Sequence, residues 1–123
     1  FDVMKEYGAK AMLHSCGSIA SIIPDIIEIG VDILDPIQVS AEGMNPEDLK
    51  RRFGDKITLH GGIDTQHLLC NGTVDEVKRE TSRIAKIFSE GSGYILAGTQ
   101  DFQNDIPVEN IVAVYDVAQK ING

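Results

Sequence analysis

The segment LKRRFGDKITLHGGIDTQ, residues 49–66, contains the end of an expected helix, a turn at Gly54, a short apolar run and a polar loop. The apolar run at residues 57–60 has the length of a strand and lacks clean polar alternation, as in strands buried on both faces. A glycine after a helix supplies the left-handed conformation that ends many helices, so Gly54 marks a helix-to-strand turn. The segment therefore predicts a buried strand between a helix and a loop.

The same apolar run occurs four times along the chain, at residues 9–14, 31–34, 57–60 and 94–97. A glycine turn precedes each run, and the glycines are Gly8, Gly30, Gly54 and the pair Gly91 and Gly93. We therefore expect four strands, each preceded by a helix that ends at a glycine in the left-handed conformation.

Helical patterns fill the intervals between these strands. Residues 1–7 have the pattern of a helix tail, and Pro24 is expected to open a short helix. Further helix starts are expected at Asn45 and Pro46, at the capping box of Thr73 and Glu76, whose helix runs to about Glu90, and at Pro107. The last helix is expected to bury Ile111, Val114, Tyr115 and Ala118.

This alternation of strand and helix predicts an α/β fold with a parallel sheet and right-handed crossovers. Both an open doubly wound sheet and a closed barrel have this alternation. Polar side chains follow all four strands rather than gathering at one point, which favours the barrel. We therefore expect residues 1–123 to form four β-α units, half of a TIM-type (β/α)8 barrel. Because the sequence begins with Phe1 inside a helical pattern, we expect a piece of a longer protein.

Composition narrows the functional classes. The chain of 123 residues carries a net charge of −8, which would repel a nucleic acid, and its basic residues are dispersed. No apolar run is long enough to cross a bilayer, so no membrane partner is expected. Cys16 and Cys70 lack the spacing of a disulfide framework, which suits a reducing cytoplasm.

His14 and Cys16 are candidate metal ligands at the end of the first strand. Residues two apart in an extended segment point the same way, and imidazole and thiolate both bind zinc. The alternative is a half-buried histidine beside an inert cysteine. A third donor would be needed, and His60, Asp64 and Asp101 are the residues considered for it.

The remaining candidates lie in the strand-to-helix loops. Asp64 is interpreted either as a carboxylate aimed into the barrel mouth or as the cap of a short turn. Gly61 and Gly62 would let the backbone approach a ligand or a neighbouring strand. Four glutamines could orient a polar substrate by hydrogen bonding or could simply bond to loop backbone: Gln38, Gln66, Gln100 and Gln103. Cys70 is expected to be a packing residue and His67 a surface residue.

Taken together, HSCGS at 14–18 and the stretches at 30–38, 49–66, 72–77, 93–96 and 105–111 resemble the uroporphyrinogen decarboxylase superfamily. The resemblance covers almost the whole chain and implies the C-terminal part of a closed barrel. Members of that superfamily either decarboxylate a tetrapyrrole without a cofactor or transfer methyl groups with zinc and a corrinoid. The H-x-C motif at His14 and Cys16 resembles the methyltransferase branch, in which zinc activates a thiol.

One position departs from both branches. The methyltransferases carry a third zinc ligand, a cysteine, after the last strand, and the decarboxylases carry a histidine there. The matching position in this sequence is Gln100. The arginines that hold the tetrapyrrole in decarboxylases belong to the N-terminal half.

The sequence therefore predicts the C-terminal half of a zinc-assisted methyltransferase that acts with a corrinoid, or with a corrinoid protein as partner. His14 and Cys16 would bind the metal, Asp64 and Gln100 would be catalytic, and Gln38 and Gln66 would contact the small-molecule substrate. The alternatives are uroporphyrinogen decarboxylase, which would need no cofactor, and an inactive half-barrel. We also expect this segment to form a homo-oligomer or to pair with an N-terminal half.

Overall fold

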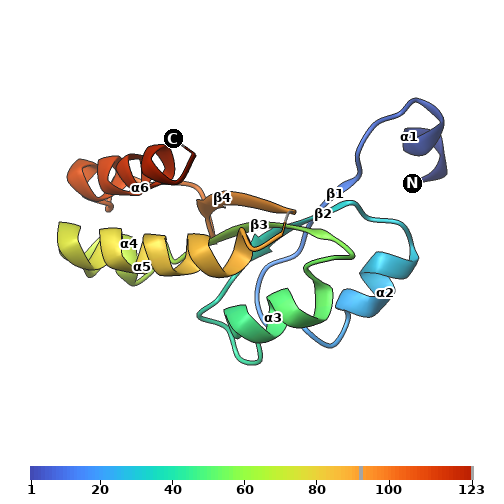
Figure 1. Ribbon diagram of the computed structural model, residues 1–123, viewed down its shortest axis with the longest axis horizontal. Coiled ribbons are helices and arrows are strands. Elements are labelled where there is room, and N and C mark those ends of the chain that lie inside the picture. The colour runs from blue at the N-terminus through green and yellow to red at the C-terminus, as the bar shows by residue number, and fades with distance from the viewer. Residues whose placement is uncertain (92, 123) are drawn as a thin grey trace.

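A single four-stranded parallel sheet organises the computed structural model, which describes residues 1–91 and 93–122. The strands are β1 (Met12–His14), β2 (Ile33–Ile37), β3 (Thr58–Ile63) and β4 (Tyr94–Gly98). They lie in the order of the sequence, β1-β2-β3-β4, and every neighbouring pair is parallel (Figure 1). This arrangement confirms the predicted α/β fold of four β-α units.

Two strands extend further than the sequence predicted. Asp35, Pro36 and Ile37 belong to β2, and Gly61, Gly62 and Ile63 belong to β3, although all six were assigned to loops. The reason is burial: Ile37 and Ile63 are fully buried and continue the apolar face beyond the polar residues. Consequently Asp35 lies within the sheet, as His60 does, rather than in a loop.

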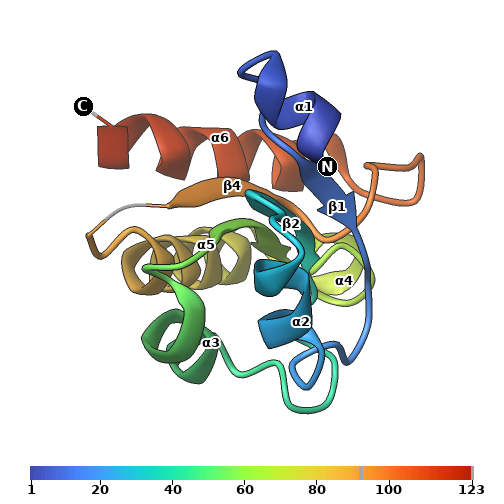
Figure 2. The same ribbon diagram turned by 90° about the vertical axis from the view of Figure 1, so that its right-hand side faces the viewer.

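The helices are α1 (Asp2–Glu6), α2 (Ile23–Glu28), α3 (Pro46–Phe53), α4 (Leu68–Asn71), α5 (Val74–Phe88) and α6 (Val108–Asn122). The predicted starts are confirmed: Pro24 lies in the first turn of α2, the Asn45 side chain caps α3, and Thr73 and Glu76 form a complete capping box. Figure 2 shows α2, α3, α4 and α5 on one side of the strands and α6 alongside β4. None of the helices within the described ranges is long and apolar enough to cross a membrane.

The prediction of a left-handed glycine before every strand is wrong at Gly54. Gly8, Gly30, Gly91 and Gly93 have φ values of 69°, 91°, 79° and 81°, whereas Gly54 has a φ of −64°. The chain continues in hydrogen-bonded turns after α3, with the Gly54 N–H donating to the Lys50 carbonyl at 2.9 Å. The reversal before β3 is therefore spread over residues 54–57.

The core lies between the sheet and the helices. Leu34 and Leu59, at matching register, are fully buried against it, together with Ile84 and Phe88 of α5. The prediction for α6 is wrong at Tyr115, which is 57% exposed. The buried side of α6 contains Ala113, Val114 and Val117 because this stripe packs toward α5.

The opposite face of the sheet is open. Met12 is 47% exposed and Ile95 is 41% exposed. The prediction that the strands are buried on both faces is therefore wrong for this chain. In the register of the sheet, Met12 pairs with Ile33 and His60 pairs with Ile95. This open face, which we call the inner face, ends in the polar residues described next.

Candidate functional site

Three polar side chains form a row across the inner face of neighbouring strands, level with the carboxyl end of β1. His14 is the last residue of β1, Asp35 is its partner in β2, and His60 lies in β3. Each follows a leucine that points to the helices, so alternation along the strands turns all three toward the inner face. The same edge of a parallel barrel carries the active site in characterised barrel enzymes.

Asp35 holds both histidines. One carboxylate oxygen, Oδ2, lies 2.8 Å from Nδ1 of His14, and the other, Oδ1, lies 2.7 Å from Nδ1 of His60. The His14 side chain is 61% exposed, whereas those of His60 and Asp35 are only 22% and 20% exposed. The arrangement fixes the more buried imidazole and directs the more exposed one.

The loop that carries Cys16 is fixed to β2 and the segment after it. The Ser15 N–H donates to the Asp35 carbonyl at 2.6 Å, and the Gly17 N–H donates to Gln38 Oε1 at 2.9 Å. The Ser18 hydroxyl donates to the Glu42 carbonyl. Cys16, between these anchors, is a free and exposed thiol. Gln38, predicted to contact substrate, thus uses its amide oxygen to position this loop.

A cavity of about 350 Å³ joins the three polar residues to the end of β4. Its lining includes His14, Asp35, His60, Gln100 and Asp101. Leu96, Phe102 and Tyr115 supply its apolar walls. The structure therefore brings two predicted site residues, His14 and Gln100, into one cavity.

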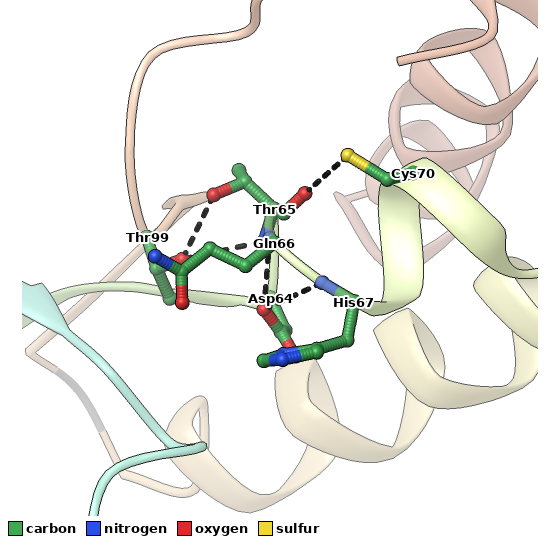
Figure 3. A network of polar contacts seen from close by, with 6 residues as sticks. All are labelled: Asp64, Thr65, Gln66, His67, Cys70 and Thr99. Carbon is green, nitrogen blue, oxygen red and sulfur yellow. Dashed lines mark hydrogen bonds and ion pairs between the residues drawn. The ribbon is translucent and has the colours of Figure 1, made fainter. Parts of the chain in front are cut away.

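Asp64 and Gln66, two further predicted site residues, do not line the cavity at His14. Asp64 Oδ1 accepts hydrogen bonds from the N–H groups of Gln66 at 3.0 Å and His67 at 3.3 Å, and Oδ2 lies 3.0 Å from His67 Nδ1. Figure 3 shows this carboxylate beneath the turn that leads into α4. The capping interpretation of Asp64 is thus the one that its contacts support. Asp64 lines a separate cavity with His67 and Leu68, and its catalytic role stays a prediction.

Two buried hydroxyls join this turn to β4. The Thr65 and Thr99 hydroxyls are 3.1 Å apart, and the Thr65 carbonyl accepts from the Cys70 thiol at 3.0 Å (Figure 3). Burial of Cys70, together with the neighbouring Asp105 carboxylate, raises the pKa of its thiol. Cys70 is therefore a packing residue, as the sequence predicted.

The donor chemistry of His14 fits a metal ligand. A histidine that binds a metal through one ring nitrogen commonly donates its other N–H to a carboxylate, and His14 Nδ1 makes this contact with Asp35. Cys16 would add a thiolate two residues later. Within residues 1–91 and 93–122, however, no group of three His, Cys, Asp or Glu side chains is placed to hold a metal. His14 and Cys16 thus offer two donors, and Gln100 offers no thiolate.

Sequence reasoning undervalued Asp35 and His60. His60 was considered only as a third donor, and Asp35 was read as a loop residue. A usable signal was present in the sequence, because His14, Asp35 and His60 each directly follow a leucine of an apolar run. The run at residues 31–34 was ended one residue before Asp35.

Comparison with known proteins identifies a family and relatives that this chain resembles. The family model for uroporphyrinogen decarboxylase (URO-D) matches residues 1–121. The methylcobamide:CoM methyltransferase MtaA of Methanosarcina barkeri is 31% identical over 106 residues, which are 84% of this chain and 28% of that protein. The uroporphyrinogen decarboxylase of Pseudoalteromonas translucida is 32% identical over 81 residues, 63% of this chain and 22% of that protein.

A solved structure agrees in fold. A methyltransferase from Methanosarcina mazei superposes with a TM-score of 0.77 at 20% identity, over 99% of this chain and 34% of that chain. That protein is of the TIM-barrel type, and this chain corresponds to a fragment of it. The chain spans about a third or less of the length of these relatives.

Proposed function

The chain belongs to the uroporphyrinogen decarboxylase (URO-D) family, and we propose that the full-length protein is a zinc-assisted methyltransferase that acts with a corrinoid. The observation that carries this proposal is the contact between His14 Nδ1 and the Asp35 carboxylate. His14 precedes the exposed Cys16 by two residues, so both donors come from one short segment. The likeness to MtaA over 84% of the chain supports the same branch.

His14 and Cys16 would hold the zinc ion, with a further donor from another strand end. When bound, zinc lowers the pKa of a thiol so that the thiolate can accept a methyl group. This chain would contribute an oriented imidazole, a fixed Cys16 loop and a polar cavity wall at Gln100 and Asp101. Phe102 and Tyr115 would supply the apolar surface for the substrate.

The second candidate, uroporphyrinogen decarboxylase, is favoured by several relatives of that name. Its substrate is a tetrapyrrole rich in carboxylates, which binds best to arginine or lysine. Among the described residues, those that line the cavity at His14 include Asp35 and Asp101 but neither arginine nor lysine. Two carboxylates would oppose such a substrate, whereas they are compatible with a cation.

The test compares both chemistries in the full-length protein. We expect bound zinc in the purified protein and methyl transfer from a methylated corrinoid to a thiol. Substitution of Cys16→Ser should lower the zinc content at least several-fold because it removes the thiolate. Cys70→Ser, the control, should retain zinc, since Cys70 lies in α4 and does not line the cavity at His14. Anaerobic conversion of uroporphyrinogen to coproporphyrinogen, without bound zinc, would instead assign the decarboxylase.

A further inference from the structure

The carboxylate of Asp35 contacts the same ring nitrogen, Nδ1, of two imidazoles at once. An ionised carboxylate has acceptors only, and each of its oxygens lies within 2.8 Å of one Nδ1. Both Nδ1 atoms must therefore carry the hydrogen. In a neutral imidazole the second nitrogen then has the lone pair, so Nε2 of His14 and Nε2 of His60 are both free bases or ligands.

Both imidazoles face one cavity. His14 and His60 line the same space of about 350 Å³, on either side of Asp35 in the strand order, and Gln100 and Asp101 of the loop after β4 line it too. His60 is the less exposed of the two, so its surroundings leave it less freedom. His14 is the more exposed and lies two residues from Cys16.

We propose that Asp35 is a positioning residue shared by two histidines, which holds both in the Nδ1–H tautomer and presents two Nε2 lone pairs to one cavity. His14 would offer its Nε2 lone pair to a bound metal, and His60 would provide a second imidazole that is not a ligand. The metal part of this proposal rests on the proposed function, whereas the tautomers do not depend on it.

Replacement of the Asp35 carboxylate by an amide should affect the tautomers of the two histidines differently. Asparagine has one acceptor oxygen and one donor NH₂ group, so it can hold only one imidazole in the Nδ1–H form. In the Asp35→Asn variant we expect the buried His60 to keep that tautomer and the exposed His14 to lose it. The measurement is long-range ¹⁵N–¹H NMR of the histidine-labelled full-length protein.

The matched control is Asp64→Asn. Asp64 contacts the Nδ1 of His67 at 3.0 Å but lines a different cavity, so this variant should leave the tautomers of His14 and His60 unchanged. Wild-type spectra that show an Nε2–H tautomer for either His14 or His60 would overturn the proposal, even if the Asn variant failed to fold. Unchanged tautomers for both histidines in a folded Asn variant would also overturn it.

Zinc affinity gives an independent readout. Loss of the carboxylate that accepts the other N–H of a metal-binding histidine commonly weakens metal binding by about 10–100-fold. Asp35→Asn should therefore show a loss of zinc affinity of that size in competition with a chelator. His60→Gln should bind zinc as the wild type does. An equal loss in His60→Gln would make His60 a ligand and contradict the proposal, as would unchanged affinity in Asp35→Asn. A wild-type protein without zinc affinity would refute the proposed function, while the tautomers still decide the role of Asp35.

Discussion

The two cysteines show how local contacts give one residue type opposite properties. Cys16 is exposed between the anchors of the loop after β1, whereas Cys70 is half-buried and donates its thiol hydrogen to the Thr65 carbonyl at 3.0 Å. Burial and the Asp105 carboxylate raise the pKa of Cys70, so its reactive thiolate is scarcer at a given pH.

We therefore predict that iodoacetamide at pH 8 alkylates Cys16 first, at least about tenfold faster than Cys70. Peptide mass spectrometry over a time course measures both rates in one sample of metal-free protein. Asp105→Asn should speed the reaction of Cys70 because it removes the neighbouring negative charge. Faster alkylation of Cys70 than of Cys16 in the folded protein would contradict this account.

At the scale of elements, the glycine pair in β3 joins two strands and a helix. The backbone at Gly61 has a φ of 111°, and a Cβ atom there would lie 3.0 Å from the Ile37 amide nitrogen. At Gly62 a Cβ atom would lie 3.0 Å from Ile84 Cγ2. The sequence left open whether these glycines let the backbone approach a ligand or a neighbouring strand. The contact of Gly61 with Ile37 of β2 supports the neighbouring strand.

Substitution of Gly61→Ala should destabilise the protein by about 2 kcal/mol or more, since a strained backbone and a close backbone contact add together. Gly43→Ala is the matched control, because Gly43 also has a positive φ, of 73°, but its Cβ would meet open space. That variant should cost about 1 kcal/mol. Denaturant unfolding of both variants measures the difference, and equal losses would show that the contact with Ile37 is unimportant.

These elements also show how far the sequence could be read. Caps and glycines depend on local chemistry, so the starts at Pro24, Asn45 and Thr73 were predictable. The strand ends were not, because Ile37 and Ile63 are buried by helices distant in sequence. Tyr115 was misplaced on α6 for the same reason: the direction of α5 selects the buried stripe.

The candidate site divides in the same way. The motif at His14 and Cys16 was visible because it is local, and so was the cap formed by Asp64. The shared contact of Asp35 with His14 and His60 joins three strands, so it depends on register. No spacing within the sequence fixes that register before the sheet is known.

At the scale of the whole molecule, the sheet of the described chain ends in two strands with one neighbour each. β1 pairs only with β2, and β4 pairs only with β3. The inner face exposes Met12 and Ile95 beside these edges. Unpaired strand edges and an apolar face both favour association.

We therefore predict that the 123-residue chain, produced alone, associates at micromolar concentration, as a homo-oligomer or with a segment that supplies opposing strands. Light scattering coupled to size exclusion measures the mass, for which a monomer gives 13.4 kDa. The double substitution Met12→Lys and Ile95→Lys should shift the population toward the monomer, because two charges on the inner face must be desolvated on contact. Val3→Lys, at an exposed residue of α1, is the control and should leave association unchanged. A wild-type chain that elutes as a sharp monomer and unfolds cooperatively would show that the open face is stable in water.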